Sequence, residues 1–307
     1  MPRMITILGP TACGKTSLAV ALALKTGGEI LSADSRQVYR RMDIGTGKDL
    51  DDYTVGEQHV DYHLIDICEP GTKYNLFQFQ HDFFVAYNKI LDAGHQPIMC
   101  GGSGLYIESV IKGYNLSPVP PDEELRRSLE SKSLDELKPM LEELKQKNGT
   151  TMHNKTDVDS VQRAIRAIEI EQYNLKHPTP DRECPPIDTL VIGIDVDRDQ
   201  RRQAITRRLK ERLQHGMIEE IEGLLKSGIS PESLMYYGLE YKYVTEYVTG
   251  IIGYDEMFRS LEIAIHQFAK RQMTWFRGME RRGTKINWIS YNQPTEIKID
   301  QILELWH

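Results

Sequence analysis

No stretch of apolar residues in this chain approaches the length of about 20 that a membrane-spanning helix needs. The first apolar segment, Met4–Leu8, is also too short to be the core of a signal peptide. Internal repeats and low-complexity segments do not occur in the 307 residues. With 40% hydrophobic residues, the chain can bury one large core or two linked ones. We therefore expect a cytoplasmic globular protein without a membrane anchor.

Cysteine is scarce and positive charge is in deficit. The four cysteines show no C-x-x-C spacing, which argues against a zinc site or a disulfide framework, and we interpret them as buried thiols. The formal net charge of −7, averaged over the whole surface, is unfavourable for the binding of nucleic acid. Basic residues nevertheless gather in three segments, 163–166, 198–212 and 270–285. These clusters are either solvated helix faces or local surfaces for a polyanion.

The most specific motif follows the first apolar segment directly. Residues 9–16 read G-P-T-A-C-G-K-T, which is a complete G-x-x-x-x-G-K-[ST] phosphate-binding loop. Backbone N–H groups of such a loop surround phosphate oxygens, Lys15 adds a positive charge, and the Thr16 hydroxyl can ligate Mg²⁺. We expect this nucleotide-binding type of loop to hold a di- or triphosphate, ATP included. The candidate ligands are Gly9, Pro10, Thr11, Ala12, Cys13, Gly14, Lys15 and Thr16.

Strand-like and helix-like segments alternate in the first third of the chain, which is typical of an α/β protein with a parallel sheet flanked by helices. Ligands of such sheets collect at the carboxyl ends of the strands. We therefore expect the phosphate loop, residues 32–39 and residues 101–106 to face one cleft. The predicted strands are Met4–Leu8, Glu29–Ala33, His63–Ile67 and Gln96–Cys100, and the predicted helices are Lys15–Lys25 and Leu76–Ala93.

The pattern changes after Gly113, where prolines precede a charged helical stretch, Glu123–Lys147. A further helix is predicted at Asp157–Asn174, and a proline-rich linker from Pro178 to Pro186 follows it. Strand character returns at 190–196, ahead of an arginine-rich helix, more helices and a short strand near 285–289. We predict a core domain with an inserted helical subdomain. Their residues are 1–113 and 188–307 for the core, and 114–187 for the insertion.

Two residues near the predicted strand ends allow more than one role. Asp34 can cap a helix, ligate magnesium or act as a general base, and its place after the second predicted strand favours catalysis. Ser103 lies in the glycine-rich turn G-G-S-G-L-Y, where its hydroxyl can cap the next helix or contact a substrate. Both residues remain candidates for an active site.

Taken together, the motifs resemble those of the tRNA dimethylallyltransferases, also called tRNA isopentenyltransferases. The resemblance covers nearly the whole chain, and the motifs come in the family's order. Bacterial members are the more similar ones, because the zinc finger at the end of eukaryotic members has no counterpart in this sequence. It implies a fold like that of the P-loop NTPases. The motifs are G-P-T-A-C-G-K-T, S-A-D-S-R-Q-V-Y, I-D-I-C-E-P, G-G-S-G-L-Y, Q-R-A-I-R-A-I-E and A-K-R-Q-M-T-W-F-R.

The resemblance implies transfer of a dimethylallyl group from dimethylallyl diphosphate to N6 of the adenosine 3′ of a tRNA anticodon. Diphosphate is released and Mg²⁺ is the cofactor. The phosphate loop would then hold a leaving group, whose developing charge it stabilises. The catalytic residues would be Asp34, accepting a proton from the amine, with Lys15, Thr16 and Ser103. We expect a monomer that binds the anticodon stem–loop.

By the same resemblance, two sets of residues bind the substrates. Diphosphate would contact the phosphate loop and either Arg208 or Arg212, between which the alignment does not choose. The residues expected to contact tRNA are Asp34, Ser35, Arg36, Gln37, Ser103, Arg126, Gln162, Arg163, Ala164, Ile165 and Arg166.

The sequence also departs from the family pattern. Glu240 stands where the family tends to have a glycine, and Ile265-His266 replace a threonine–arginine pair. These changes bear on tRNA binding more than on prenyl chemistry. Three other functions remain: a prenyltransferase acting on free AMP or ADP, a small-molecule kinase that uses the phosphate loop, and a non-catalytic RNA-binding protein.

Overall fold

The computed structural model describes residues 4–116, 118–149, 159–177 and 184–306. Contacts divide the chain into two compact units, one formed by Met1–Gly113 with Pro185–His307 and the other by Tyr114–Cys184. The predicted helix start at Asp157 and the first linker prolines, Pro178 and Pro180, lie outside the described residues. Within the described ranges, none of the helices combines the length and the apolar character that a membrane crossing requires.

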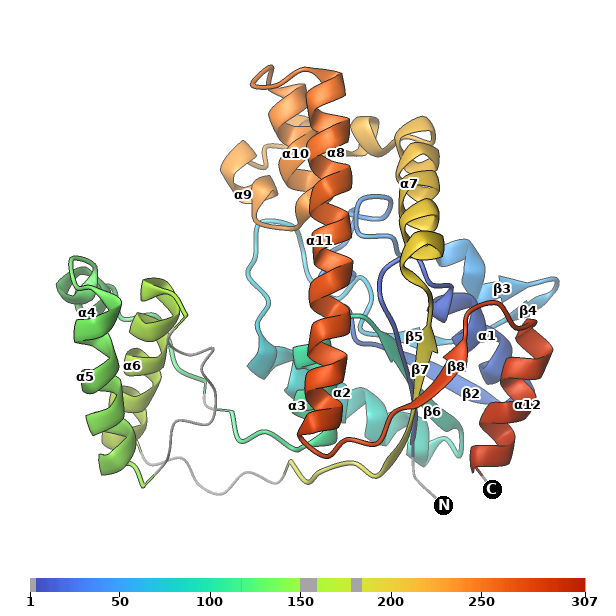
Figure 1. The fold of residues 1–307 in the computed structure, drawn as a ribbon, viewed down its shortest axis with the longest axis horizontal. Coiled ribbons are helices and arrows are strands. Elements are labelled where there is room, and N and C mark those ends of the chain that lie inside the picture. Colours follow the sequence, from blue (N-terminus) through green and yellow to red (C-terminus); the bar gives the residue numbers. More distant parts are fainter. Residues whose placement is uncertain (1–3, 117, 150–158, 178–183, 307) are drawn as a thin grey trace. The chain divides into compact units, whose positions relative to one another are not determined.

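The first unit is built on a six-stranded sheet in which all neighbouring strands run parallel, as the sequence predicts (Figure 1). The strand order is β5-β2-β6-β1-β7-β8, so the first strand lies in the interior of the sheet. Strand β7 pairs with β1, with Ile5 opposite Leu190, although the inserted unit separates the two strands in the sequence. The strands are β1 Met4–Leu8, β2 Gly28–Ser32, β5 Tyr62–His63, β6 Gln96–Gly101, β7 Thr189–Asp195 and β8 Asn287–Ser290.

Side chains of β1 alternate between two apolar cores, one on each face of the sheet. Met4 and Leu8 join the core that contains residues of α2, α3 and α11, whereas Ile5 and Ile7 join the core that contains residues of α1 and α12. Burial on both faces explains why the strands read as nearly continuous apolar runs. The helices named here are α1 Lys15–Thr26, α2 Leu76–Asp92, α3 Gly104–Ile111, α11 Tyr254–Arg281 and α12 Thr295–Trp306.

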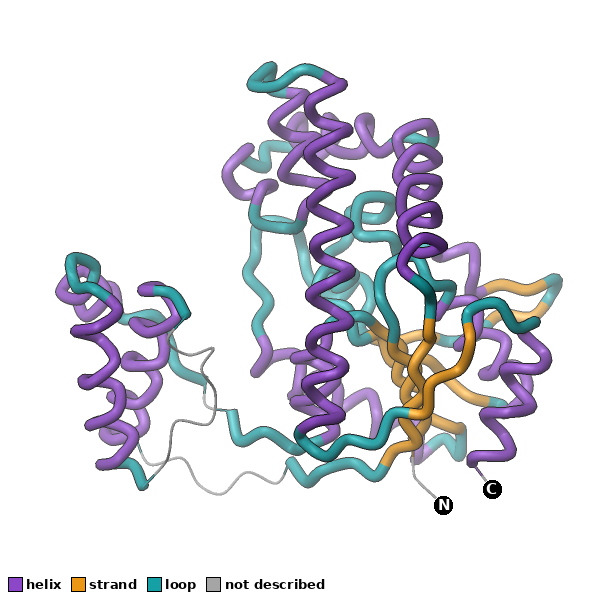
Figure 2. The backbone as a smooth tube through the Cα atoms, viewed as in Figure 1, coloured by secondary structure: helices purple, strands orange, loops and turns teal. Residues whose placement is uncertain are grey.

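The remaining helices of this unit lie between β7 and β8 in the sequence, and Figure 2 shows them as a helical group with the long α11. The arginine-rich helix α7 begins at its cap Asp197, whose side chain accepts hydrogen bonds from two backbone N–H groups. These helices are α7 Arg198–Gln214, α8 Met217–Lys226, α9 Pro231–Met235 and α10 Leu239–Val248. A short 3₁₀ helix, Leu50–Tyr53, and a hairpin of β3 Thr54–Val55 with β4 Gln58–His59 precede β5.

The predicted strand at His63–Ile67 is wrong in extent. The edge strand β5 covers only Tyr62–His63, because Leu64 and Asp66 have φ values of 66° and 55°, which interrupt the extended backbone. The thiols also differ from the prediction, since Cys13 and Cys100 are buried but Cys68 and Cys184 are partly exposed; all four are free.

The described residues of the second unit form three helices that share a small apolar core. Helices α4 Glu123–Leu129 and α5 Leu134–Lys147 replace the single predicted stretch, and α6 spans Val161–Lys176. The core residues are Leu129, Leu137, Leu141, Ala164, Ile165 and Ile168.

Candidate active site

The phosphate loop joins β1 to α1, as the sequence predicts. Gly14 caps α1 with φ 70°, a left-handed conformation that favours glycine, and Ala12 adopts a similar φ of 62°. The Thr11 backbone N–H donates to Oε1 of Gln272 at 2.8 Å, and Nε2 of Gln272 donates to the Gly102 carbonyl at 3.0 Å. Gln272 on α11 therefore joins the phosphate loop to the glycine-rich turn after β6.

The glycines of that turn are explained by close packing against α11. A Cβ on Gly102 would lie 2.4 Å from Nε2 of Gln272, and one on Gly104 would lie 2.2 Å from Cδ1 of Trp275. The sequence motif A-K-R-Q-M-T-W therefore contributes side chains that seat the turn. No role for Gln272 is predictable from the sequence, because its partners are 261 and 170 residues away.

We expect Gln272→Ala to destabilise the first unit by about 1–3 kcal/mol, because two backbone groups lose a buried partner. Unfolding in urea, followed by circular dichroism, measures this change. The matched control is Gln267→Ala, since Gln267 is an exposed residue of the same helix. Equal midpoints for Gln272→Ala and the wild type would contradict the bridging role.

Asp34 lies just beyond β2 and is held in an Asx turn. Its Oδ1 accepts a hydrogen bond from the Arg36 backbone N–H at 2.9 Å. Its Oδ2 accepts none from the part of the chain that the structure describes, so one carboxylate oxygen is available to a substrate. Ser103 lies next to it, because the Ser103 N–H donates to the Ala33 carbonyl at 3.2 Å and the Ser35 N–H donates to Oγ of Ser103 at 3.1 Å. The Ser103 side chain makes no helix-capping hydrogen bond.

Gln37 braces the loop that follows rather than pointing freely into the site. Its Oε1 accepts from the Ser32 hydroxyl at 2.8 Å, and its Nε2 donates to the Gly47 carbonyl at 2.9 Å. Further along this loop, Glu220 of α8 accepts the consecutive backbone N–H groups of residues 43–45 at 2.8, 2.7 and 3.1 Å. The fully buried Lys48 donates to the Tyr39 carbonyl at 2.7 Å. These contacts fix the segment that carries Asp34 and Arg36.

The two candidate arginines of α7 have different partners. The Arg208 guanidinium donates to the Thr11 hydroxyl of the phosphate loop. Arg212 is largely buried and binds the Asp49 carboxylate at 3.1 and 3.2 Å. Burial, and then the positive charge of Arg212, lowers the pKa of Arg208 to about 10, so that Arg208 is still charged at neutral pH. An anion beside Arg208 would relieve this repulsion.

A cavity of about 650 Å³ adjoins this arginine pair. Basic and acidic groups share its wall, since Arg208 and Arg212 line it together with three aspartates of residues 43–51. It is lined by Asp43, Ile44, Asp49, Leu50, Asp51, Arg208, Glu211, Arg212 and His215.

Glu240, where the resemblance to the family leads us to expect a glycine, lies within electrostatic reach of the site. It stands in the first turn of α10, and burial raises its pKa, although Arg212 and Arg208 act in the opposite direction. The negative charge of Asp34 adds to the upward shift. Glu240 therefore couples electrically to the predicted base and to both arginines.

We expect Glu240→Gln to stabilise the protein at neutral and alkaline pH. The folded protein holds the Glu240 proton more tightly than the unfolded chain, so stability falls as pH rises from the ordinary value of 4.5 through the raised pKa. A glutamine does not ionise and escapes this loss. Melting temperatures measured from pH 4 to pH 8 should therefore diverge as pH rises, with Glu240→Gln the higher. Glu304→Gln, a change at an exposed residue of α12, should follow the wild type throughout.

In the second unit, the predicted tRNA contacts fall into three groups. Gln162 and Arg163 are exposed on α6, whereas Ala164 and Ile165 lie in the apolar core, so the side chains of the latter pair are not available to RNA in this unit. Arg126 and Arg166 both bind the buried Glu169, with Nε of Arg126 at 3.0 Å from Oε1. Burial opposes the charged form of Glu169, but the Asp122 N–H and these two arginines outweigh it and lower its pKa.

No group of three or more His, Cys, Asp or Glu side chains able to hold a metal ion occurs among the residues that the structure describes. The motif's candidate magnesium ligand is the Thr16 hydroxyl, at the start of α1. Mg²⁺ commonly keeps several waters and binds through phosphate oxygens with one or two protein ligands. Thr16 fits a magnesium ion that arrives with a diphosphate better than one held by a protein cage.

Known proteins are similar to this chain over most of its length. A family model described as IPP transferase matches residues 37–279, and one described as isopentenyl transferase matches residues 2–60. The tRNA dimethylallyltransferase 2 of Bacteroides fragilis is 59% identical over 297 residues, covering 97% of this chain and 95% of that protein. The tRNA dimethylallyltransferase 1 of Porphyromonas gingivalis is 59% identical over 303 residues, covering 99% of both.

Solved structures share the fold. The tRNA isopentenylpyrophosphate transferase of Bacillus halodurans matches with a TM-score of 0.71 and 31% identity, covering 100% of this chain and 96% of that one. A eukaryotic dimethylallyltransferase acting on tRNA matches with a TM-score of 0.75 at 20% identity, covering 95% of this chain and 74% of that one, which supports the fold alone. The parallel sheet, the phosphate loop and these relatives together place the chain in the tRNA dimethylallyltransferase family.

Proposed function

We propose that this protein transfers a dimethylallyl group from dimethylallyl diphosphate to N6 of the adenosine immediately 3′ of the anticodon in tRNA. The observation that carries the proposal is the meeting of three segments at the carboxyl edge of the sheet. Gln272 ties the phosphate loop to the turn after β6, and Ser103 of that turn accepts from the backbone beside Asp34. The relatives are named tRNA dimethylallyltransferases, and from these names we infer the dimethylallyl group and the tRNA as the substrates of this protein.

In this reaction, the adenosine N6 attacks C1 of the dimethylallyl group while the bond between C1 and the ester oxygen of the diphosphate breaks. The electron pair of that bond leaves with diphosphate, and the proton of N6 passes to the open carboxylate oxygen of Asp34. Negative charge develops on diphosphate, where Lys15, Arg208 and the N–H groups of the loop stabilise it. Positioning of the amine opposite the leaving group contributes a further part of the rate.

Magnesium is proposed as the cofactor, with the Thr16 hydroxyl as its protein ligand. When bound, it neutralises charge on the diphosphate. For tRNA, we propose contacts from Ser35, Arg36, Ser103, Gln162 and Arg163. Arg126, Arg166 and Gln37 support these surfaces through the internal contacts described above. We further propose that the protein acts as a monomer in the cytoplasm, where its tRNA substrate resides.

The test is incorporation of a labelled dimethylallyl group, with Mg²⁺, into unmodified tRNA in one reaction and into AMP, ADP or ATP in others. We expect label in tRNA alone, at the adenosine 3′ of the anticodon. Label on free nucleotides alone would make the protein a nucleotide prenyltransferase. Absence of transfer together with nucleotide turnover would indicate a kinase, and absence of both would indicate an RNA-binding protein without this activity.

A further inference from the structure

Tyr236 is an aromatic residue that the fold leaves open to solvent beside the predicted adenosine site. It follows α9, and 47% of its surface is exposed. Two cations lie over its ring, with Cζ of Arg36 at 5.4 Å and Nζ of Lys73 at 5.6 Å from the ring centroid. The backbone N–H of Arg36 is the group that binds Asp34. One residue therefore links the exposed ring to the predicted base.

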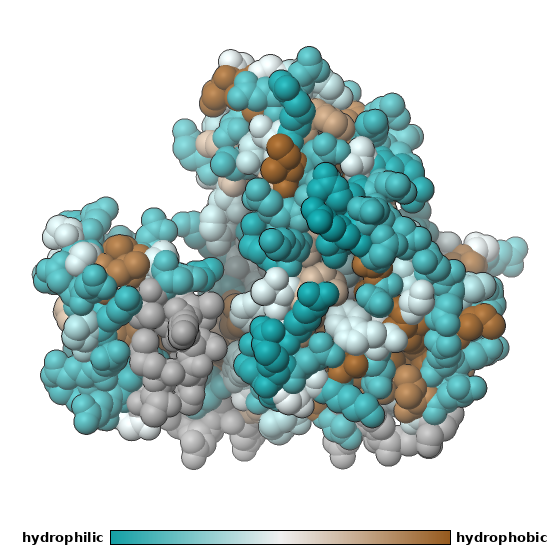
Figure 3. Space-filling view, in the orientation of Figure 1, coloured by the Kyte–Doolittle hydropathy of each residue, from teal (hydrophilic) through white to brown (hydrophobic). Residues whose placement is uncertain are grey.

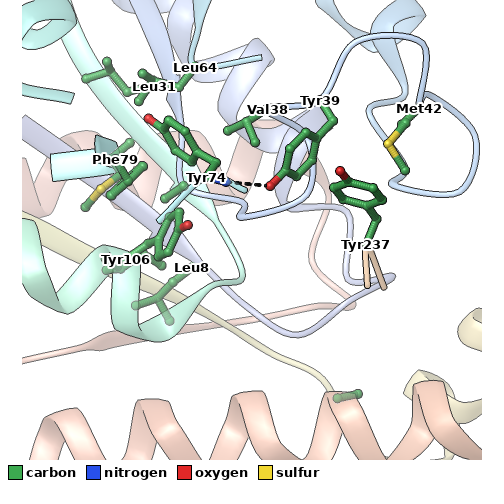
Figure 4. Packing of buried hydrophobic residues seen from close by; sticks show 14 of the residues in the cluster. Leu8, Leu31, Val38, Tyr39, Met42, Leu64, Tyr74, Phe79, Tyr106 and Tyr237 are labelled. Atoms are coloured by element: carbon green, nitrogen blue, oxygen red, sulfur yellow. Dashed lines mark hydrogen bonds between the residues drawn. The ribbon is translucent and has the colours of Figure 1, made fainter. Parts of the chain in front are cut away.

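The ring of Tyr236 rests on a rigid support. Its neighbour Tyr237 is buried, and the two rings meet edge to face at 5.6 Å. The Tyr237 hydroxyl accepts from the Gly71 N–H at 2.6 Å and donates to the Thr72 carbonyl at 2.9 Å. Its ring also packs at 4.5 Å against Tyr39, as Figure 4 shows. Tyr236 thus packs against a ring that hydrogen bonds and a second aromatic contact hold in place.

The chemistry of this patch suits one kind of ligand. An aromatic face stacks on an unpaired nucleobase. A base that takes the place of Arg36 or Lys73 over the Tyr236 ring would leave these cations to attract the adjoining phosphates. Elsewhere on the first unit, exposed apolar side chains are scattered among hydrophilic ones, as Figure 3 shows for one face. Asp34 and Tyr236 both act electrostatically on one residue, Tyr106. Burial and then Tyr39 raise the pKa of Tyr106, and Asp34 and Tyr236 raise it further.

We propose that Tyr236 is a stacking platform for an unpaired base of the substrate RNA, next to the adenosine that faces Asp34. The inference rests on the proposed function and adds a binding site to it. We assign the platform to RNA binding, so the handling of the prenyl donor should not depend on it.

The experiment uses the full-length protein and a synthetic anticodon stem–loop RNA, with 2-aminopurine placed at each loop position in turn. We expect Tyr236→Ala to raise the dissociation constant for this RNA about 5- to 100-fold. Tyr236→Phe keeps the ring and should stay close to the wild type. Stacking quenches 2-aminopurine, so one loop position should lose fluorescence on binding to the wild type and to Tyr236→Phe, but not to Tyr236→Ala. The KM for dimethylallyl diphosphate should not change.

Two controls separate stacking from other causes. Tyr254→Ala removes another exposed tyrosine, which is 45% exposed and packs on Tyr247, and it should bind RNA normally. The slope of log Kd against log salt should be unchanged in Tyr236→Ala, because no phosphate contact is lost, but should fall by about one in Lys73→Ala. If Tyr236 only positions Arg36, its effect should vanish in an Arg36→Gln background, which would overturn the platform.

An unchanged dissociation constant for Tyr236→Ala, or equal quenching in Tyr236→Ala and the wild type, would also overturn it. In either case, normal prenyl transfer to RNA by the wild type would leave the proposed function standing. Failure of the wild type to prenylate RNA would instead overturn the proposed function and the platform together.

Discussion

Asp34→Asn should lower kcat about 10²- to 10⁴-fold while dimethylallyl diphosphate still binds, because the amide removes a proton acceptor and leaves the phosphate loop intact. Asparagine is nearly the same size and keeps an oxygen that can accept from the Arg36 N–H, as Oδ1 of Asp34 does at 2.9 Å. The Asx turn should therefore survive. Single-turnover transfer of labelled dimethylallyl to tRNA measures the chemical step directly.

The matched control for this change is Asp61→Asn. Asp61 is an exposed residue just before the edge strand β5, and its backbone carbonyl, which the substitution does not alter, accepts from the Ile30 N–H at 2.9 Å. Its rate should equal that of the wild type. A rate for Asp34→Asn within about tenfold of the wild type would be below the range of a general base and would assign the proton to another group.

Arg208→Ala should lower kcat about 10²- to 10³-fold, the range found when a group that stabilises developing negative charge is removed. Arg208 is the arginine that contacts Thr11 of the phosphate loop, and Arg212 opposes its charge. Among the residues that the structure describes, no acid forms an ion pair with it. Product inhibition by diphosphate should weaken as well, since the same guanidinium would bind the leaving group after transfer. Steady-state rates and the inhibition constant of inorganic diphosphate measure the two effects.

The neighbouring residue on the same helix provides the control. The side chain of Arg207 is 70% exposed and lies 3.9 Å from Glu211, so Arg207→Ala removes an equal charge at the surface and should change neither constant appreciably. Arg212→Ala should lower the rate less than Arg208→Ala, because the Arg212 guanidinium is already paired with Asp49. The reverse order of the two effects would transfer the diphosphate contact to Arg212.

The sequence predicted the parts of the fold that depend on local pattern. The bounds of β1 and the phosphate loop follow from an apolar run and a motif, and the structure confirms both. The length of β5 was mispredicted, because the left-handed conformations of Leu64 and Asp66 leave no trace in hydrophobic periodicity. The division of the Glu123–Lys147 stretch into two helices was likewise missed.

The site was predictable only as a set of separate segments. Motifs identified the phosphate loop, Asp34 and Ser103, since each follows a strand end. They did not reveal that Gln272 bridges two of these segments, that Glu220 holds the loop after Asp34, or that Arg208 and Arg212 have different partners. Such contacts join residues more than 160 positions apart in the chain, and no local spacing encodes them.

The interior position of β1 determines when the first unit can be completed during synthesis. One neighbour, β6, ends at Gly101, but the other, β7, begins only at Thr189 and is separated from it by the inserted unit. At about 5–20 residues per second, a ribosome needs roughly 10 to 40 s to pass from β1 to the end of β7. Throughout that interval one edge of β1 has no partner strand. The nascent chain therefore presents an apolar strand edge of the kind that chaperones shield, and it presents this edge for longer because of the insertion.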